Sequence, residues 1–148
     1  MKIISNNKKA FHDFFVSDLV EAGISLQGSE VKSLRQGGCS LNDSFVQIID
    51  GEVYLKNAYI KPYDKTSSFA PDTKRTRKLL LHKDQILSLS KKSSEKGYTI
   101  IPTKIYFSKG KVKLEIGLGK GKKLYDKRQS LKESDIKKEI SRISKNLG

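Results

Sequence analysis

Residues 44–55 have the sequence SFVQIIDGEVYL, in which two β-rich runs flank the dipeptide Asp50-Gly51. Asp-Gly is a preferred sequence of two-residue hairpin turns, because glycine accepts the positive φ angle that these turns require. The stretch therefore predicts a tight β-hairpin. We expect the second strand to continue through Tyr59-Ile60 and to end at Pro62.

More strands are predicted on both sides of this hairpin. Residues 98–107 and 111–118 form two β-rich runs joined by a turn at Ser108-Lys109-Gly110, and the second run alternates strictly between charged and aliphatic residues. Such alternation is typical of a strand with one buried face. Residues 10–16 and 22–26 predict two early strands separated by a polar turn. Successive hairpins with few helices favour a small antiparallel barrel over βαβ units.

Two short helices are predicted between these strands. The first covers residues 29–35, with Ser29 as its N-cap and Gly37-Gly38 beyond its end. The second covers residues 83–93, and we expect three of its aliphatic side chains to face inward: Ile86, Leu87 and Leu89. Residues 79–81, three leucines, fit either a buried strand or a helix start, and the polar residues 64–74 predict a mobile surface loop.

Composition restricts the partner and the compartment. The chain has 148 residues, with 30 Lys+Arg against 16 Asp+Glu and a formal net charge of +14. No apolar run is long enough to span a membrane, and the single cysteine, Cys39, fits a reducing cytoplasm. We expect a cytoplasmic monomer whose partner is a nucleic acid rather than a membrane. A solubility role for the charge is the alternative.

The C-terminal segment differs from the rest of the chain. From Lys120 to Gly148 there are ten Lys+Arg against four Asp+Glu. Residues 130–133 have the capping-box form, and isoleucines follow at helical spacing: Ile136, Ile140 and Ile143. One apolar stripe with nothing to cover it gives a marginal helix in water. We therefore predict a domain over 1–128 and a tail over 129–148 that is disordered when free and helical when bound.

No sequence pattern of catalysis or cofactor binding was identified. The segment 117–123 lacks the spacing and the Ser or Thr of a phosphate-binding Walker loop, and His12 and His82 stand apart without the spacing of a metal site. There is no nucleophile-elbow motif and no dense cluster of carboxylates. We expect a protein that is not an enzyme and that needs no metal or cofactor.

Basic clusters are the stronger signal. The run Arg75-Thr76-Arg77-Lys78 and the pair Lys8-Lys9 are candidates for phosphate contacts, and a solvated charge run is the alternative for each. Phe11 and Tyr125 lie beside lysines and could stack on unpaired bases. Four other phenylalanines are expected in the core because they lie in apolar strand patterns: Phe14, Phe15, Phe45 and Phe107.

An ordered set of segments resembles the bacterial small protein B family, the SsrA-binding proteins of trans-translation. The matching segments are Asn7-Lys8-Lys9-Ala10, Glu21-Ala22-Gly23-Ile24, residues 28–35 (GSEVKSLR), Asp43-Ser44-Phe45, Asp50-Gly51-Glu52, residues 75–81 (RTRKLLL) and residues 119–128 (GKGKKLYDKR). Each segment alone is a weak signal, but together they cover nearly the whole chain in family order.

The resemblance implies a fold and a function. It implies a six-stranded antiparallel barrel that is similar to an oligonucleotide-binding (OB) fold, with flanking helices. It also implies binding to the tRNA-like domain of transfer-messenger RNA and delivery of that RNA to ribosomes stalled on an mRNA without a stop codon. The tail would then enter the empty mRNA channel near the decoding centre of the small subunit. A generic ribosomal or initiation-factor-like RNA-binding module and an RNA-processing enzyme are the rival interpretations.

The resemblance also assigns residues to two sites. The RNA-binding surface would comprise Asn7, Lys8, Lys9, Glu21, Lys32, Arg35, Arg75, Arg77, Lys78 and Leu80. The decoding region and channel would be contacted by Lys120, Lys122, Lys123, Tyr125, Asp126, Lys127 and Arg128, followed by the isoleucine stripe of the tail. Family members often carry a lysine at the position of Gly38, so this chain lacks any RNA contact that such a lysine makes.

Overall fold

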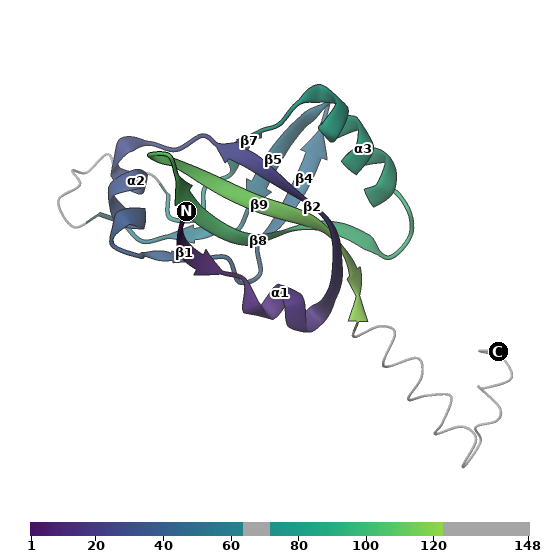
Figure 1. The fold of residues 1–148 in the computed structure, drawn as a ribbon, viewed down its shortest axis with the longest axis horizontal. Helices are drawn as coiled ribbons and strands as arrows, with labels where there is room; N and C mark the ends of the chain where they lie inside the picture. Colours follow the sequence, from purple (N-terminus) through teal and green to yellow (C-terminus); the bar gives the residue numbers. More distant parts are fainter. Residues whose placement is uncertain (64–71, 123–148) are drawn as a thin grey trace, which may run out of the picture.

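Six strands close into a ring in the computed structural model, which describes residues 1–63 and 72–122 (Figure 1). Each strand of the ring is antiparallel to both of its neighbours. In ring order the strands are β8 (Tyr98–Ser108), β4 (Phe45–Ile49), β5 (Glu52–Lys56), β7 (Arg77–Leu80), β2 (Phe14–Ile24) and β9 (Lys111–Gly121), which pairs again with β8. The prediction of a mainly β protein built on a six-stranded OB-like barrel is confirmed.

The predicted hairpin over residues 44–55 is present as β4 and β5. Val46 pairs with Leu55 and Ile48 with Val53. At the turn, Asp50 has a φ of 50° and Gly51 a φ of 79°, as a two-residue turn with positive φ at both central positions requires. Residues 79–81, which the sequence left open, begin inside a strand, since β7 ends at Leu80.

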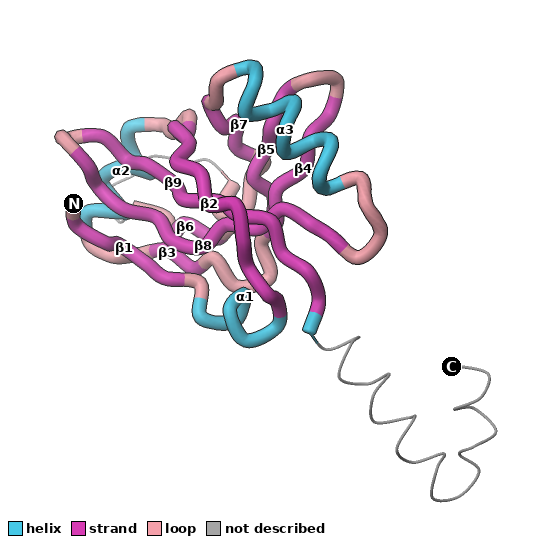
Figure 2. The backbone as a smooth tube through the Cα atoms, turned by 45° about the vertical axis from the view of Figure 1, so that its right-hand side comes forward, coloured by secondary structure: helices cyan, strands magenta, loops and turns pink. Residues whose placement is uncertain are grey.

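The β8–β9 hairpin connects the two sides of the ring. Its register runs from Tyr98 opposite Lys120 to Ser108 opposite Lys111. Two strands share the other edge of β8. Ile100 pairs with β4, and residues 104–107 pair with β1 (Lys2–Asn6). Figure 2 shows β1 lying beside β8 outside the ring. A separate two-stranded sheet joins β3 (Cys39–Ser40) to β6 (Tyr59–Ile60).

The two early strands predicted from the sequence are wrong in their bounds. Residues 8–13 form helix α1 (Lys8–Asp13), and β2 is then continuous from Phe14 to Ile24. The helix forms because the Asn7 side chain caps it by accepting from the backbone N–H of Ala10. Within β2 the expected turn is a bulge between Ser17 and Val20, where Asp18 has a φ of 53°.

The two predicted helices are present as α2 (Gly28–Arg35) and α3 (Lys83–Ser93). Figure 1 shows them at opposite ends of the barrel, with α1 along its lower side. The N-cap of α2 is Gln27, in a capping box with Glu30, rather than Ser29. In α3, Leu89 is buried as expected, but Leu87 is 64% exposed, so the inward face is narrower than predicted.

The core fills the barrel with aliphatic side chains. Leu114 and Ile116 are fully buried, as the alternation of β9 predicts, and they pack with Val53, Leu55 and Leu79 from the opposite strands. Two of the phenylalanines expected in the core are exposed: Phe15 by 55% and Phe45 by 36%. No helix among residues 1–63 and 72–122 is long and apolar enough to cross a membrane.

Candidate RNA-binding surface

A buried ionic network occupies the position where the sequence suggested phosphate contacts. The Arg77 side chain is completely buried, and its Nη2 and Nε donate to Glu30 Oε2 at 2.7 and 2.9 Å. Its Nη1 donates to the backbone oxygen of Ala58 at 2.8 Å, and its Nη2 also donates to the backbone oxygen of Thr73 at 3.1 Å. Arg75 binds the same carboxylate from the other side, with Nη2 2.6 Å from Glu30 Oε1.

This network assigns Arg77 to the scaffold. A guanidinium that is buried and fully hydrogen-bonded to protein does not fit the predicted direct contact with RNA. Arg75 is one-quarter exposed and shares its charge with Glu30. Burial would raise the pKa of the Glu30 carboxyl, but hydrogen bonds from Arg75, the Gln27 backbone and Arg77 outweigh it and hold the pKa below its usual value.

Asn7 is likewise part of the interior. It is 2% exposed, and its Nδ2 donates to the Pro102 carbonyl at 2.8 Å while its Oδ1 caps α1. Its backbone N–H donates to the carbonyl of Thr103 at 2.8 Å. Both ends of the amide and the main chain are thus used to fix α1 against β8. A side chain buried in this way does not fit a direct contact with RNA. The two hydrogen bonds of its amide explain why an asparagine is required here for the fold.

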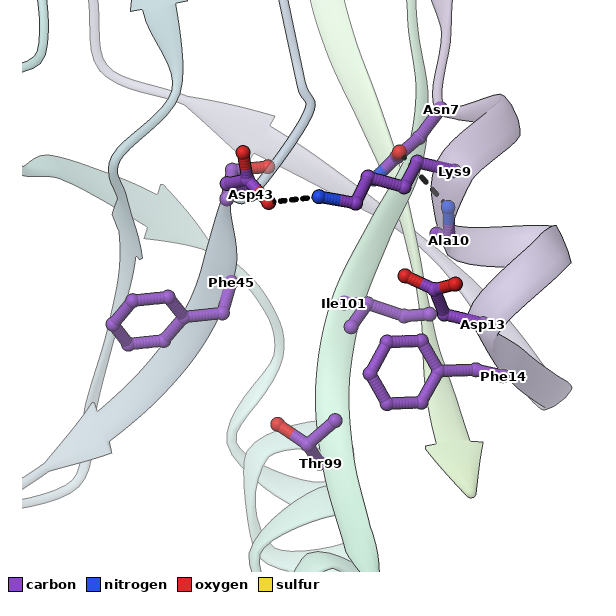
Figure 3. Close-up of a pocket in the computed structure, with 10 residues that line it drawn as sticks. Asn7, Lys9, Ala10, Asp13, Phe14, Asp43, Phe45, Thr99 and Ile101 are labelled. Carbon is purple, nitrogen blue, oxygen red and sulfur yellow. Dashed lines mark hydrogen bonds and ion pairs between the residues drawn. The ribbon is translucent and has the colours of Figure 1, made fainter. Parts of the chain in front are cut away.

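The adjacent lysines are exposed on α1. Lys9 Nζ lies 2.5 Å from Asp43 Oδ1 and spans the mouth of a cavity of about 260 Å³ (Figure 3). Figure 3 shows Phe14 and Ile101 on one side of this cavity and Phe45 on the other. The hydrogen bond that Lys9 donates to Asp43, followed by the charge of Asp43, raises the pKa of Lys9. Lys8 points its charge to solvent from the same turn of the helix.

Glu21 and Leu80 lie on one outward face formed by neighbouring strands. Leu80 of β7 is paired with Gly23 of β2, and Gly23 is paired on its other side with Lys113 of β9. Cross-strand partners share a face, and Glu21 shares it with Gly23 because side chains alternate along a strand. Leu80 is 56% exposed and lies directly over Gly23, whose Cβ position would be 3.3 Å from Leu80 Cβ.

The same face contains residues that the sequence analysis did not single out. Tyr106 of β8 pairs with Lys113, and its hydroxyl donates to Glu21 Oε2 at 2.5 Å. Lys104 of β8 lies opposite Glu115 of β9, and its Nζ is 3.9 Å from Glu115 Oε2. The alternation of β9 indicated that Lys113 faces outward, but only the order of strands in the ring shows that it lies beside β2, with Gly23 between it and Leu80. We call Glu21, Leu80, Lys104, Tyr106 and Lys113 the outer face.

Of the other predicted RNA-binding residues, two lie on α2, and Lys78 shares the outward face of β7 with Leu80. Lys32 and Arg35 are exposed on α2, beside the rings of Tyr63 and Phe107 at 5.6 and 6.0 Å. Lys78 is exposed on β7 and forms an ion pair with Glu52 at 2.8 Å.

At the position of Gly38, a Cβ would lie 2.8 Å from the Cβ of Lys61 and 2.9 Å from Ser33 Oγ. A lysine at this position therefore requires the chain around Lys61 to shift.

Of the predicted decoding-region residues, Lys120 and Lys122 are described at the end of β9. The others lie outside the described residues: Lys123, Tyr125, Asp126, Lys127, Arg128, Ile136, Ile140 and Ile143. The boundary between domain and tail at residue 128 lies there too and stays a prediction.

The side chains considered for metal binding or nucleophilic chemistry are isolated. Within the part of the chain that the structure describes, no three His, Cys, Asp or Glu residues gather as metal ligands would. Burial raises the pKa of the Cys39 thiol to about 11, and Arg77 opposes the shift. A thiol with this pKa is a poor nucleophile at neutral pH.

The comparisons with known proteins agree with one another. A family model described as "SmpB protein" matches residues 4–146. The SsrA-binding protein of Sulfurihydrogenibium sp. (strain YO3AOP1) is 55% identical over 144 residues, which cover 97% of this chain and 95% of the relative. The SsrA-binding protein of Geobacter metallireducens is 51% identical over 140 residues, with 95% and 92% covered.

A solved structure is similar as well. It is described as "tmRNA-SmpB: a journey to the center of the bacterial ribosome", and it matches with a TM-score of 0.69 and 47% sequence identity over 80% of this chain and 83% of that chain. A family match over nearly the full length, together with relatives more than half identical in sequence, shows that the chain belongs to the SmpB protein family.

Proposed function

We propose that this protein binds the tRNA-like domain of transfer-messenger RNA (SsrA RNA) and delivers it to stalled ribosomes for trans-translation. Relatives about half identical in sequence are SsrA-binding proteins, and a similar structure is that of tmRNA-SmpB and the ribosome. The observation that carries the proposal is the outer face, where one exposed leucine, one oriented carboxylate and two lysines come together from four strands.

The chemistry of the outer face suits a folded RNA. Structured RNA is recognised mainly through its shape, backbone and unstacked bases. The exposed Leu80 can pack on an unstacked base, while Glu21 can accept hydrogen bonds from base amino or ribose hydroxyl groups. Lys104 and Lys113 supply positive charge for phosphates. The hydroxyl of Tyr106 holds one oxygen of Glu21, leaving the other oxygen for RNA.

Further cations extend this surface. We assign backbone contacts to Lys8, Lys9 and Lys78, and additional ones to Lys32 and Arg35 on α2. Asn7, Arg75 and Arg77 support the surface from within, through α1 and the network around Glu30. Because the function is binding and delivery, we assign the protein no catalytic group, metal or cofactor, and we place it as a monomer in the cytoplasm where ribosomes work.

The C-terminal segment has a separate task in this proposal. Lys120 and Lys122 stand where β9 ends, so residues 123–148 start from that edge of the barrel. We assign this segment to the decoding region and the empty mRNA channel of the small subunit. Folding of its isoleucine stripe only in a vacant channel would make delivery conditional on the absence of message.

The experiment is a salt-titrated binding assay with the tRNA-like domain and duplex RNA of equal length as competitor. Full-length protein and residues 1–128 are compared, together with Leu80→Ser and Leu87→Ser. These two leucines are similarly exposed, at 56% and 64%, but only Leu80 lies on the outer face. We expect both lengths to bind despite competitor, Leu80→Ser to bind about tenfold more weakly and Leu87→Ser to bind normally.

Two results would contradict the proposal. Binding that duplex RNA displaces equally well would reduce the protein to a generic basic RNA binder. Equal effects of the two leucine variants would remove the outer face as the recognition surface.

A further inference from the structure

A row of aromatic and basic side chains crosses three strands at the end of the barrel where β9 finishes. Phe15 of β2 is paired with Lys120 of β9, and Lys120 is paired with Tyr98 of β8. The next row on the same face contains Leu118 and Ile100, both buried in the core. Phe15 is nevertheless 55% exposed. The row therefore marks the place where the apolar face of the sheet reaches solvent.

Each of two rings in this row has an ammonium group over it. Lys122 Nζ lies 5.0 Å from the centre of the Phe15 ring and donates to the Phe11 carbonyl at 3.0 Å. Lys120 Nζ lies 5.6 Å from the centre of the Tyr98 ring. Phe11, the neighbour on α1, is itself 48% exposed. We call Phe11, Phe15, Tyr98, Lys120 and Lys122 the aromatic row.

Aromatic rings interleaved with lysines are the chemistry that binds single-stranded nucleic acid. An unpaired base stacks on an exposed ring with little regard to its identity, and neighbouring cations bind the phosphates on either side. An apolar protein partner would not need an ammonium group beside each of the two rings. A base-paired helix presents no free base face to stack on Phe15. Charge and shape together select an unpaired nucleotide.

The aromatic row is separate from the outer face. Lys113 and Glu115, which mark the outer face on β9, have odd numbers, whereas Lys120 has an even number on the same regular strand. Alternation therefore points Lys120 to the opposite side of the sheet. The row also lies five residues farther along β9 than Glu115, about 17 Å at the rise of a strand. The aromatic row and the outer face therefore point away from opposite sides of the sheet.

We propose that Phe15 stacks on an unpaired base of a single-stranded RNA segment that is distinct from the tRNA-like domain. Tyr98 and Phe11 extend the stacking surface, and Lys120 and Lys122 bind the phosphates next to that base. The inference rests on the proposed function in taking RNA as the partner, but it assigns a second binding site that adds Phe11, Phe15 and Tyr98 to the two lysines.

The test uses the full chain and a six-nucleotide single-stranded oligoadenylate with 2-aminopurine at a central position. Stacking on Phe15 should quench the 2-aminopurine fluorescence as the oligonucleotide binds. We expect Phe15→Leu to weaken binding at least about fivefold and to abolish the quenching, the loss of roughly one base–aromatic stack. Phe15→Trp should preserve both. Phe45→Leu, at an exposed phenylalanine outside the row, is the matched control and should change neither.

The same variants are measured with the tRNA-like domain to separate the two proposals. We expect Phe15→Leu to bind the tRNA-like domain with unchanged affinity. We also expect the wild-type protein to bind both RNAs at once. Competition between the two RNAs, or equal losses from Phe15→Leu and Phe45→Leu, would overturn the second site and leave the proposed function standing. Failure of the wild-type protein to bind the tRNA-like domain would instead overturn the proposed function.

Discussion

Glu30 is the carboxylate on which two arginines depend. It is 3% exposed, and Arg77, the more deeply buried of its two partners, is completely buried. Glu30→Gln keeps the shape of the side chain but leaves a buried guanidinium without a counter-charge, so we expect a loss of about 3–5 kcal/mol in the free energy of unfolding. Urea unfolding followed by circular dichroism measures it. The matched control, Glu52→Gln, breaks an exposed pair with Lys78 and should have a much smaller effect.

The same residue predicts how stability responds to acid. The pKa of Glu30 is lower in the folded protein than in the unfolded chain, where it is about 4.3. Its contribution is therefore complete above that pH and is lost as the pH falls through the folded-state value. Glu30→Gln should lose less stability than the wild type between neutral and acidic pH. If the free energy of unfolding falls by the same amount with pH in both proteins, Glu30 is not responsible for the loss of stability in acid.

Tyr106 is a positioning residue for RNA binding. Its ring is buried, and its hydroxyl fixes the exposed Glu21 carboxylate. We expect Tyr106→Phe to weaken binding of the tRNA-like domain by roughly threefold to tenfold, the range of a single ordinary hydrogen bond. The unfolding free energy should change little, because water can replace the hydroxyl at Glu21. A double-mutant cycle with Glu21→Gln checks the mechanism, since a purely structural tyrosine would give additive losses.

At the scale of elements, the bulge in β2 depends on a glycine in the neighbouring strand. A Cβ on Gly117 would lie 2.9 Å from both Leu19 Cδ2 and Val16 Cγ1 and 3.1 Å from the Ser17 carbonyl oxygen. Gly117→Ala should therefore cost about 1–3 kcal/mol in unfolding free energy, as overpacking does. Gly121→Ala on the same strand is the control, because nothing lies within 4 Å of its Cβ position. Equal midpoints in thermal unfolding would contradict this account.

Local patterns predicted some elements well and failed on others for identifiable reasons. The β4–β5 and β8–β9 hairpins follow from Asp50-Gly51 and from strict alternation, both of which are properties of neighbouring residues. Helix α1 was missed because its start depends on the buried cap Asn7, which is fixed by β8 about a hundred residues away in the chain. The succession of hairpins favoured a small barrel, whereas its closure from six strands was implied by the family resemblance.

The candidate site shows the same division. The resemblance assigned the exposed residues Leu80 and Glu21 to RNA binding, and they share a face. Tyr106 and Lys113 join them from β8 and β9, and the positions of these strands follow only from the order of strands in the ring. Arg77 was assigned to RNA because a run of basic residues resembles a phosphate site. Its carboxylate partner is 47 positions away in the sequence, so no local pattern could show that its charge is already used.

The whole molecule combines an RNA-binding barrel with a C-terminal segment, and the two parts can be tested apart. The outer face, on β2, β7, β8 and β9, lies on the opposite side of the sheet from Lys120, which leads toward the C-terminal residues. Loss of function in that segment should therefore leave the binding of the tRNA-like domain intact. RNA binding and the role of the C-terminal segment can therefore be measured separately.

Replacing two isoleucines of the tail, Ile136→Asp with Ile143→Asp, should abolish peptide tagging on stalled ribosomes. The change puts charge into the apolar stripe that the sequence predicts, so a helix could no longer bury that stripe against a surface. The control is Ser134→Asp with Ser141→Asp, which adds the same charge on the opposite side of the predicted helix and should preserve most tagging. Both proteins should bind the tRNA-like domain like the wild type. If tagging survives the isoleucine changes, the hypothesis of an apolar helix face is wrong. If both pairs abolish tagging equally, the added charge explains the loss, because only an amphipathic helix distinguishes the two pairs of positions.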